Sequence, residues 1–520
     1  MSTTDYLVIG GGSAGCVLAR RLSDDPAVRV TLVEAGPADG GAAVRDPAHW
    51  TELIGGPLDW GHAYEPAAPT LHRHIPIPRG RVLGGSSAIN AMLWYRGHPA
   101  DYDAWGAGWD FATLLPYFRR SEDRVLAGAS LAEVDEWRGT GGPMHVEREA
   151  EPHPVALAVL DAAAELGLPL IADANGATNL GATVPEYTAR FGGPRAEGRE
   201  LDRRARRHSA ADGYLAPVAD RPNLRIRCGA LVTGLEFAGG RCVGARYRVA
   251  GGTAGESVVR AEREVILCLG ALETPRLLML AGIGPADHLR DNGIAVRADL
   301  PVGDRLADHP LVTGMTFRAR APLGPVRGTG GGAMVNWCGP ESERPDLHAF
   351  VVQGPHATPE VAARFRLDPP VFAVSPGLMR SRSLGTVRLT SADPTAHLRI
   401  QPNLLGEPED VRALCAAVEL VQELGESRAL RAVAAGPAAP DRRLDAGERE
   451  AFVRLATSTF FHVAGTAAIG SVVDRELRVH GVEGLRVVDA SVFPSLPSCN
   501  TNAPVIAVAE RAADLVKESV

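Results

Sequence analysis

A short pattern at the start of the chain constrains its fold more than any other feature. The run DYLVIG, residues 5–10, is apolar and reads as a buried parallel strand. The segment that follows, GGSAGCVLARRLSDD, places Ala14, Leu18 and Leu22 on one face of a helix. A second strand-like run, VRVTLVEAG, comes next at 28–36. This order predicts one βαβ unit, and with it an α/β domain built on a parallel sheet.

The loop between this strand and helix carries the pattern GxGxxG at Gly10, Gly12 and Gly15. Glycine lets the backbone approach a pyrophosphate, and the helix N-terminus offers free N–H groups and the positive end of the helix dipole. Glu34 ends the next strand, 19 residues after Gly15, where its carboxylate can accept hydrogen bonds from ribose hydroxyls. The unit therefore predicts a dinucleotide-binding site. NAD and FAD share this loop, so it does not distinguish between them.

Size, charge and cysteine content limit the class of protein further. At 520 residues the chain is too long for one ordinary core, so two or three structural units are expected. The net charge of −8 argues against nucleic acid as a partner, and we interpret the one dense basic run, RRARRHS at 203–209, as a solvated or lid loop. We find no signal-peptide pattern and no apolar stretch long enough to span a membrane. The seven scattered cysteines argue against a disulfide framework and a bound metal, so we expect a cytoplasmic protein without membrane insertion.

The remaining sequence alternates between two kinds of pattern. Residues 263–300 pass from a β-rich run through a turn into a helix, and the last 60 residues combine strands with a closing helix. Residues 311–400 instead alternate short β-like runs with glycine-rich turns, which indicates an antiparallel sheet, while 408–424 and 440–456 have helical patterns. The expected fold class is α/β plus α+β, with a discontinuous Rossmann-type domain and a substrate domain built on an antiparallel sheet flanked by helices. We assign 1–155, 208–310 and 457–520 to the Rossmann-type domain, and 156–207 and 311–456 to the substrate-binding domain.

Motifs spread over nearly the whole chain resemble those of the glucose–methanol–choline (GMC) oxidoreductases. GRVLGGSSAINAMLWYRGHPADYDAW, residues 80–105, resembles the first signature of that family. GALETPRLLMLAGIG, residues 270–284, resembles the second, with Ala281 where the family has serine. The tail VVDASVFPSLPSCNTNAPVIAVAERAADLV also resembles a family block, and the blocks are most similar to bacterial choline-dehydrogenase-like and hydroxymethylfurfural-oxidase-like members. The resemblance implies FAD as the cofactor of the Rossmann-type domain.

The resemblance also assigns residues to the flavin site. Ser87 and Asn90 offer hydrogen-bonding groups beside the flavin, with turn stabilisation as the alternative role for each. Val232 matches the position whose backbone meets the adenine, or is a plain strand valine, and Asp489 matches the position that contacts the ribityl chain directly or through water. Some members attach FAD covalently through a histidine where this chain has Ile89, so we expect non-covalent FAD. The full expected set is Gly10, Gly12, Ser13, Ala14, Gly15, Glu34, Ala35, Arg81, Val82, Gly84, Gly85, Ser87, Asn90, Ala91, Met92, Val232, Asp489, Ala490, Asn502 and Pro504.

The run FHVAGTAAIG, residues 461–470, matches the family block that carries the catalytic histidine. That residue maps to His462, for which a buried core histidine is the alternative, and the second member of the reacting pair maps to Asn502, with Asn500 close by. Alcohol oxidation removes a hydroxyl proton as a hydride moves to flavin N5, and an imidazole with an intrinsic pKa of about 6.5 can accept that proton. The amide of Asn502 can donate to the developing alkoxide without adding charge. We interpret His309 as a support for the loop near the flavin pyrophosphate.

The predicted reaction is oxidation of a small primary alcohol, aromatic or aliphatic, to the aldehyde. Phe460, Phe461 and Trp337 could line an apolar pocket for it, with core packing as their alternative role. No aromatic and acidic cage for choline can be assembled from the sequence. The electron acceptor is O2 or an organic, quinone-like carrier. The alternatives are a hydroxynitrile lyase that keeps FAD without net redox, a carrier-linked choline-type dehydrogenase, a NAD-dependent dehydrogenase and a non-catalytic nucleotide-binding module.

Overall fold

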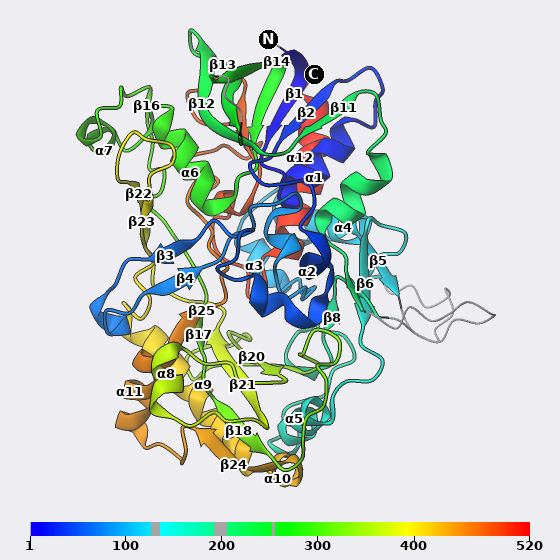
Figure 1. The fold of residues 1–520 in the computed structure, drawn as a ribbon, viewed down its shortest axis with the longest axis vertical. Coiled ribbons are helices and arrows are strands. Elements are labelled where there is room, and N and C mark those ends of the chain that lie inside the picture. The colour runs from blue at the N-terminus through cyan, green and yellow to red at the C-terminus, as the bar shows by residue number, and fades with distance from the viewer. Residues whose placement is uncertain (1, 126–135, 192–204, 252–254, 520) are drawn as a thin grey trace, which may run out of the picture.

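The computed structural model describes residues 2–125, 136–191, 205–251 and 255–519, which pack around two large hydrophobic cores. In Figure 1 the elements that surround the first core lie at the top, where the blue start and the red end of the chain meet, and most of those that surround the second lie at the bottom, coloured from teal to orange. No helix in these ranges is both long and apolar enough to cross a bilayer.

A seven-stranded sheet forms the first domain. Its order is β11 (Leu224–Arg227), β2 (Val30–Val33), β1 (Ser2–Ile9), β14 (Ser257–Leu267), β13 (Arg241–Val249) and β12 (Ala230–Ala238), and β26 (Leu485–Val487) also pairs with β14. β1 is parallel to β2 and to β14, whereas β12, β13 and β14 pair in antiparallel fashion. Helix α1 (Ser13–Leu22) follows β1 and packs against α12 (Asn502–Glu518), the last helix of the chain (Figure 1). The predicted βαβ unit is confirmed.

An eight-stranded antiparallel sheet forms the second domain. Its order is β24 (Ala434–Ala439), β18 (Thr316–Ala319), β21 (Val371–Leu378), β20 (Leu347–Val352), β19 (Met334–Trp337) and β7 (Gly181–Thr183). β17 (Pro310–Val312) also pairs with β21, and β25 (Thr457–Thr459) pairs with β17. The helices packed around it are α5 (Pro154–Glu165), α9 (Pro408–Glu426), α10 (Arg428–Val433) and α11 (Ala446–Ala456). The expected fold class, including the antiparallel sheet with flanking helices, is confirmed.

The other elements are short. The helices are α2 (Gly41–Arg45), α3 (Pro99–Asp103), α4 (Phe111–Ser121), α6 (Gly270–Leu280), α7 (Ala286–Asp291) and α8 (Pro359–Arg364). The strands are β3 (His62–Tyr64), β4 (Ile75–Ile77), β5 (Glu122–Val125), β6 (Met144–Arg148), β8 (Glu186–Tyr187), β9 (Ala189–Arg190), β10 (Arg206–Arg207), β15 (Ile283–Gly284), β16 (Ala298–Asp299), β22 (Thr386–Leu389) and β23 (Leu398–Gln401).

Two segments pack in a different domain from the one that the sequence-based boundaries assign them to. β25 begins at the boundary residue 457, yet it pairs with β17 and so belongs to the second sheet. The hairpin β22–β23 packs Val387 and Ile400 into the first core, although it lies within the 311–456 segment. An alternating pattern identifies a strand but does not say which sheet that strand joins. We therefore move both segments in our proposed division of the chain.

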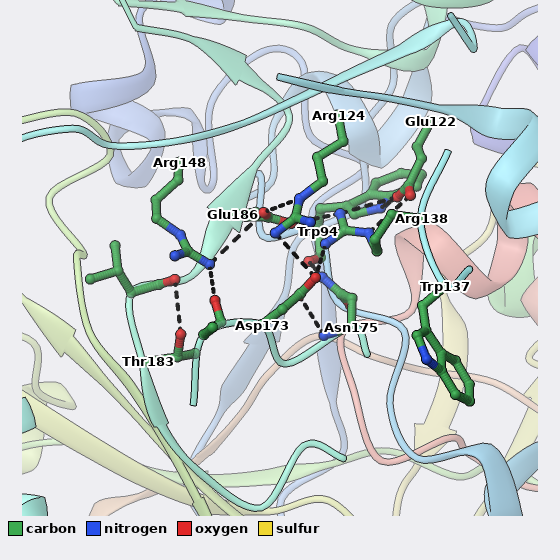
Figure 2. A network of polar contacts seen from close by, with 12 residues as sticks. Trp94, Glu122, Arg124, Trp137, Arg138, Arg148, Asp173, Asn175, Thr183 and Glu186 are labelled. Atoms are coloured by element: carbon green, nitrogen blue, oxygen red, sulfur yellow. Dashed lines mark hydrogen bonds and ion pairs between the residues drawn. The ribbon is translucent and has the colours of Figure 1, made fainter. Parts of the chain in front are cut away.

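A buried network of arginines and carboxylates joins the first signature segment to the small sheet β5–β6–β8. Glu122 accepts hydrogen bonds from Trp94 Nε1 at 2.8 Å and from Arg138 Nε at 2.9 Å (Figure 2). Arg138 also donates to Glu186 and to Asp173, each at 2.6 Å. Because Arg138 and Glu122 are almost fully buried, each charge depends on its partners to offset the loss of hydration. The network therefore fixes the middle of the signature segment, whose preceding residues line the cavity described next.

Candidate active site

A cavity extends from the dinucleotide loop to the strand pair β17–β25. Many of the expected cofactor residues line it, namely Gly10, Gly12, Ser13, Ala14, Glu34, Ala35, Gly85, Asn90, Ala91, Met92, Val232, Asp489, Ala490 and Asn502. His462, Phe460 and Phe461 line it as well. Residues that are far apart in the sequence thus form one continuous wall.

The other expected cofactor residues shape the loops behind this wall. A Cβ on Gly15 would lie 1.9 Å from the carbonyl oxygen of Gly10, so glycine here lets α1 approach β1 closely. Ser87 Oγ donates to the Gly84 carbonyl at 2.6 Å and accepts from the Ala210 N–H at 3.0 Å, which is the turn-stabilising role. The structure does not place the following residues on the cavity wall: Gly15, Arg81, Val82, Gly84, Ser87 and Pro504.

Two carboxylates at the dinucleotide end are held by main-chain N–H groups and by one threonine hydroxyl group. Glu34 accepts hydrogen bonds from the N–H groups of Gly11 and Gly36, both at 2.7 Å, and its burial raises its pKa. Asp489 accepts from the Gly270 N–H at 2.9 Å and from Thr274 Oγ1 at 2.6 Å. Both carboxylates therefore stiffen the loops that border the cavity while keeping further acceptor capacity.

The cavity fits a dinucleotide on the evidence of its own residues. Asn502 Oδ1 accepts from Ser13 Oγ at 2.7 Å, whereas its buried Nδ2 has no hydrogen-bond partner among the described residues. A buried donor without a partner is costly, so this amide is poised for an acceptor in the cavity. Gly12 gives the loop a bare surface, because a Cβ there would meet no protein atom closer than 3.9 Å. The loop therefore leaves room for a pyrophosphate beside the N-terminus of α1.

At the other end of the cavity, strand pairing brings two histidines together. Ala307 and Ala464 exchange two main-chain hydrogen bonds of 3.0 Å, and the Phe460 N–H donates to the His309 carbonyl at 3.0 Å. His309 Nδ1 consequently lies 2.9 Å from His462 Nδ1. The expectation that His309 supports the pyrophosphate loop is wrong, because the pairing of β17 with β25 carries it to the reacting end.

The hydrogen bonds of His462 define its tautomer. Asn500 Nδ2 lies 3.2 Å from His462 Nε2, and an amide nitrogen can only donate, so Nε2 carries the lone pair. The proton is then on Nδ1 and is donated to His309 Nδ1. Burial lowers the pKa of His462 well below its ordinary value, and repulsion from His309 and His348 in their protonated forms and from Arg79 acts in the same direction. The imidazole is therefore neutral at pH 7, with its basic nitrogen beside the cavity.

The structure brings Asn500 to His462 and does not bring Asn502 there. Asn502 is the first residue of α12, and its side chain faces Ser13 of the dinucleotide loop. Asn500 lies two residues earlier, in the turn before that helix, and faces the histidine. Both amides belong to one short motif of the sequence. Their side chains point to different partners because α12 begins at Asn502.

Of the aromatic residues expected at the substrate pocket, two line the cavity and one does not. Phe460 stacks on His462 with ring centroids 5.5 Å apart and planes 9° from parallel, and Phe461 also lines the cavity. Trp337 instead packs in the second core, because its side chain lies on the core side of β19. Trp60 and Phe350 line the cavity too, and sequence reasoning missed them because they lie in segments without a motif.

The basic run at 203–209 is only partly within the described residues, since 203 and 204 lie outside them. Arg207 is buried and donates to the main-chain oxygens of Val44 at 2.9 Å and Asn90 at 2.6 Å. It also donates to Asn90 Oδ1 at 2.9 Å. The interpretation as a solvated loop is therefore wrong at Arg207, which braces the signature segment.

The fold and this site define a class of protein, namely a two-domain dinucleotide enzyme with a buried, neutral imidazole at the end of the cofactor cavity. Two family models described as GMC oxidoreductase match the chain, one over residues 4–311 and one over residues 381–509. The chain belongs to the GMC oxidoreductase family.

Individual relatives agree with this assignment. The mitochondrial choline dehydrogenase of Mus musculus is 37% identical over 552 residues, covering 98% of this chain and 89% of its own. The structure of pyridoxine 4-oxidase from Mesorbium loti has a TM-score of 0.90 at 32% identity and covers 98% of both chains. Formate oxidase has a TM-score of 0.87 at 26% identity and covers 100% of this chain and 98% of its own. The protein binds FAD and is an oxidoreductase that acts on CH–OH donors.

Proposed function

We propose that the protein oxidises a small uncharged primary alcohol to the aldehyde, with His462 as the general base and FAD bound non-covalently. Bound FAD supplies the two-electron acceptor. The observation that carries this proposal is the lone pair of His462 Nε2, which lies beside the cavity while Nδ1 is tied to His309. That lone pair accepts from Asn500, so an alcohol hydroxyl group that enters the cavity takes the place of the amide N–H and can then pass its proton to Nε2.

Asn500 completes the proposed reacting pair. When the substrate hydroxyl group occupies His462 Nε2, the amide N–H of Asn500 is released and can donate to the substrate oxygen as that oxygen becomes negative. Asn502 is then left to bind the cofactor through its unpaired Nδ2. We accordingly assign the second catalytic position to Asn500, and the sequence-based assignment to Asn502 becomes the competing hypothesis.

The charges around the cavity support an uncharged substrate. Phe350, Phe460 and Trp60 give the wall an apolar surface, and the positive charge of Arg79 helps to lower the pKa of His462. The carboxylate of Glu273, which also lines the cavity, is occupied by His62 at 3.0 Å and by Arg276 at 2.9 Å. Glu34 and Asp489 lie at the dinucleotide end, so near His462 a quaternary ammonium group would meet no described carboxylate of the wall that lacks a cationic partner, which favours an aromatic or aliphatic alcohol over choline.

Anaerobic reduction of the flavin across a panel of alcohols tests the substrate class. The panel contains pyridoxine, benzyl alcohol, 1-butanol and choline, and the measured quantity is the rate at which the long-wavelength flavin absorbance is lost. We expect the aromatic alcohols to reduce the flavin fastest. A clear preference for choline would favour the choline-type dehydrogenase, and an unbleached flavin with cleavage of a hydroxynitrile would favour the lyase.

The same samples test the remaining parts of the proposal. Admitting air after reduction and measuring peroxide distinguishes an oxidase from a carrier-linked dehydrogenase. Denaturation should release the flavin into the supernatant, since Ile89 has no group that could bond to it. His462→Ala should lower the reduction rate by roughly 100- to 10,000-fold while FAD is retained. An unchanged rate in this variant would remove His462 from its role.

A further inference from the structure

We propose that Asp308 is a positioning residue that holds the main chain of residues 459–462, so that the imidazole of His462 keeps its direction toward the cavity. The inference rests on the proposed function, in which His462 is the general base. Asp308 is 3% exposed and does not line the cavity, so it acts through other residues.

The carboxylate of Asp308 accepts four hydrogen bonds. Oδ1 accepts from the main-chain N–H groups of His309 and His462, both at 2.8 Å. Oδ2 accepts from the hydroxyl groups of Tyr64 and Thr459. Both imidazoles of the reacting end are therefore attached, through their own main chains, to one carboxylate.

The residue between these attachment points has an unfavourable backbone conformation. Phe461 has φ = +65°, in the left-handed region that bulky side chains rarely adopt. Its N–H donates to Thr459 Oγ1 at 2.7 Å, and the same hydroxyl group donates to Asp308. A conformation of this kind persists only where neighbouring groups stabilise it. Here the Thr459 hydroxyl group connects the Phe461 N–H to the carboxylate of Asp308.

The peptide group that joins Phe461 to His462 is held from both sides. Its carbonyl oxygen accepts from the guanidinium of Arg79, and its N–H donates to Asp308. Without the carboxylate, we expect Phe461 to relax out of the left-handed region, and the imidazole to rotate away from His309 and Asn500. A displacement of about 1 Å is enough to slow a reaction by about 100-fold.

Three variants of the full-length holoenzyme separate positioning from a general loss of structure. Asp308→Asn keeps an oxygen for the His462 N–H, and the hydroxyl groups of Tyr64 and Thr459 can turn to accept from its amide. Asp308→Ala removes every link. Tyr64→Phe is the matched control, because it removes one hydrogen bond to Asp308 that does not lead to residues 459–462.

The first measurement is the anaerobic flavin-reduction rate with the best alcohol of the panel. We expect Asp308→Ala to lose about 100-fold at saturating alcohol, with FAD content unchanged and the half-saturating concentration within about threefold. Asp308→Asn and Tyr64→Phe should stay within about tenfold of the parent. An Asp308→Asn enzyme as slow as Asp308→Ala would overturn the proposal, because the charge rather than the hydrogen bonds would then matter.

The second measurement does not depend on turnover. Long-range ¹H–¹⁵N spectra of histidine-labelled holoenzyme report the tautomer of His462, whose signals are identified by their loss in His462→Ala. The Nδ1-protonated form should be seen in the parent and in Asp308→Asn and should give way to a mixture in Asp308→Ala. An unchanged spectrum in folded Asp308→Ala would overturn the proposal, even if no alcohol reduced the flavin and the proposed function had failed.

If Asp308→Ala does not fold, Thr459→Val provides the test. It leaves the carboxylate in place and removes the hydroxyl group that links Phe461 to it. We expect a loss of about tenfold in the reduction rate and a mixed tautomer signal. A parent-like rate and spectrum in Thr459→Val would refute the positioning role.

Discussion

The protonation of single residues at the reacting end is controlled by burial. Burial lowers the pKa of His309 to about 3, so this ring stays neutral and can accept the Nδ1 proton of His462 throughout the neutral range. The pKa of His462 is lowered for the same reason, with the neighbouring charges as smaller causes. Neither ring needs a counter-ion at pH 7, which suits a cavity for an uncharged alcohol.

The lowered pKa of His462 predicts the acid limb of the pH profile. A base whose pKa is below 6.5 stays unprotonated as the pH falls through 6.5, so activity should persist there. We expect kcat/KM for the alcohol to be constant from pH 8 to 6.5 and to fall only at lower pH. Stopped-flow or steady-state rates over pH 4.5–8 measure this profile. An inflection at or above pH 6.5 would contradict it.

The two asparagines near the start of α12 should fail in different ways. Asn500→Ala removes a donor at the reacting oxygen, so we expect kcat/KM to fall by about 100-fold with FAD affinity little changed. Asn502→Ala removes the unpaired buried donor and the bond to Ser13, so FAD should dissociate more readily. Each variant is the control for the other. The reverse pattern would restore the sequence-based assignment.

At the scale of elements, helix α1 can approach strand β1 closely because residue 15 is a glycine. Gly15→Ala places a Cβ 1.9 Å from the Gly10 carbonyl, and we expect it to destabilise the domain by about 1–3 kcal/mol and to prevent FAD binding. Gly12→Ala is the matched control, since its Cβ would meet no protein atom closer than 3.9 Å, so this variant should weaken FAD binding alone. Thermal unfolding and flavin titration distinguish the two. Equal stability of both variants would refute this account.

The arginine–carboxylate network in Figure 2 should contribute strongly because it is buried. Arg138→Met removes a cation from two buried carboxylates and leaves Glu122 with only Arg96 and Glu186 with only Arg124 as a close cationic partner among the described residues, so we expect a loss of about 3–5 kcal/mol. Arg442→Met is the control, since its pair with Glu448 is exposed to solvent and such pairs contribute little to stability. Denaturant unfolding measures both. A loss below about 1 kcal/mol at Arg138 would show that the network is not needed for stability.

At the scale of the whole molecule, buried histidines make stability depend on pH. Burial lowers the pKa of His309 and His348 to about 3 and that of His356 to about 4, against about 6.5 in the unfolded chain. Below pH 6.5 the unfolded chain binds protons that the folded protein does not, so stability is complete above that pH and decreases as the pH falls.

We expect each of these three histidines to lower the free energy of unfolding by about 1 kcal/mol between pH 7 and pH 5.5. Calorimetric melting temperatures at the two pH values measure the combined effect. His348→Gln should reduce the pH dependence, whereas a substitution of the exposed His72 should not change it. A melting temperature that is the same at both pH values would contradict the prediction.

Much of this organisation follows from the sequence because it is local. The strand, glycine loop and helix at 5–35 are adjacent, so spacing alone specifies them, and the alternation at 311–400 specifies antiparallel strands. What could not be predicted depends on contacts between distant segments. The pairing of β17 with β25 carries His309 to His462, and the start of α12 turns Asn502 away from it. Burial of Arg207 under the signature segment has the same origin.

The first and last helices of the chain pack side by side in Figure 1, and Ser13 bonds to Asn502, 489 residues away. Arg21 of α1 likewise forms two hydrogen bonds of 2.8 Å with Glu510 of α12. The Asn502 amide and the Glu510 carboxylate both come from α12, so the walls that meet at the glycine loop are contributed by segments 489 residues apart. The cradle for the flavin is complete only when these two segments have docked on each other. Cofactor binding in this architecture therefore reports long-range folding, and not the folding of the glycine loop alone.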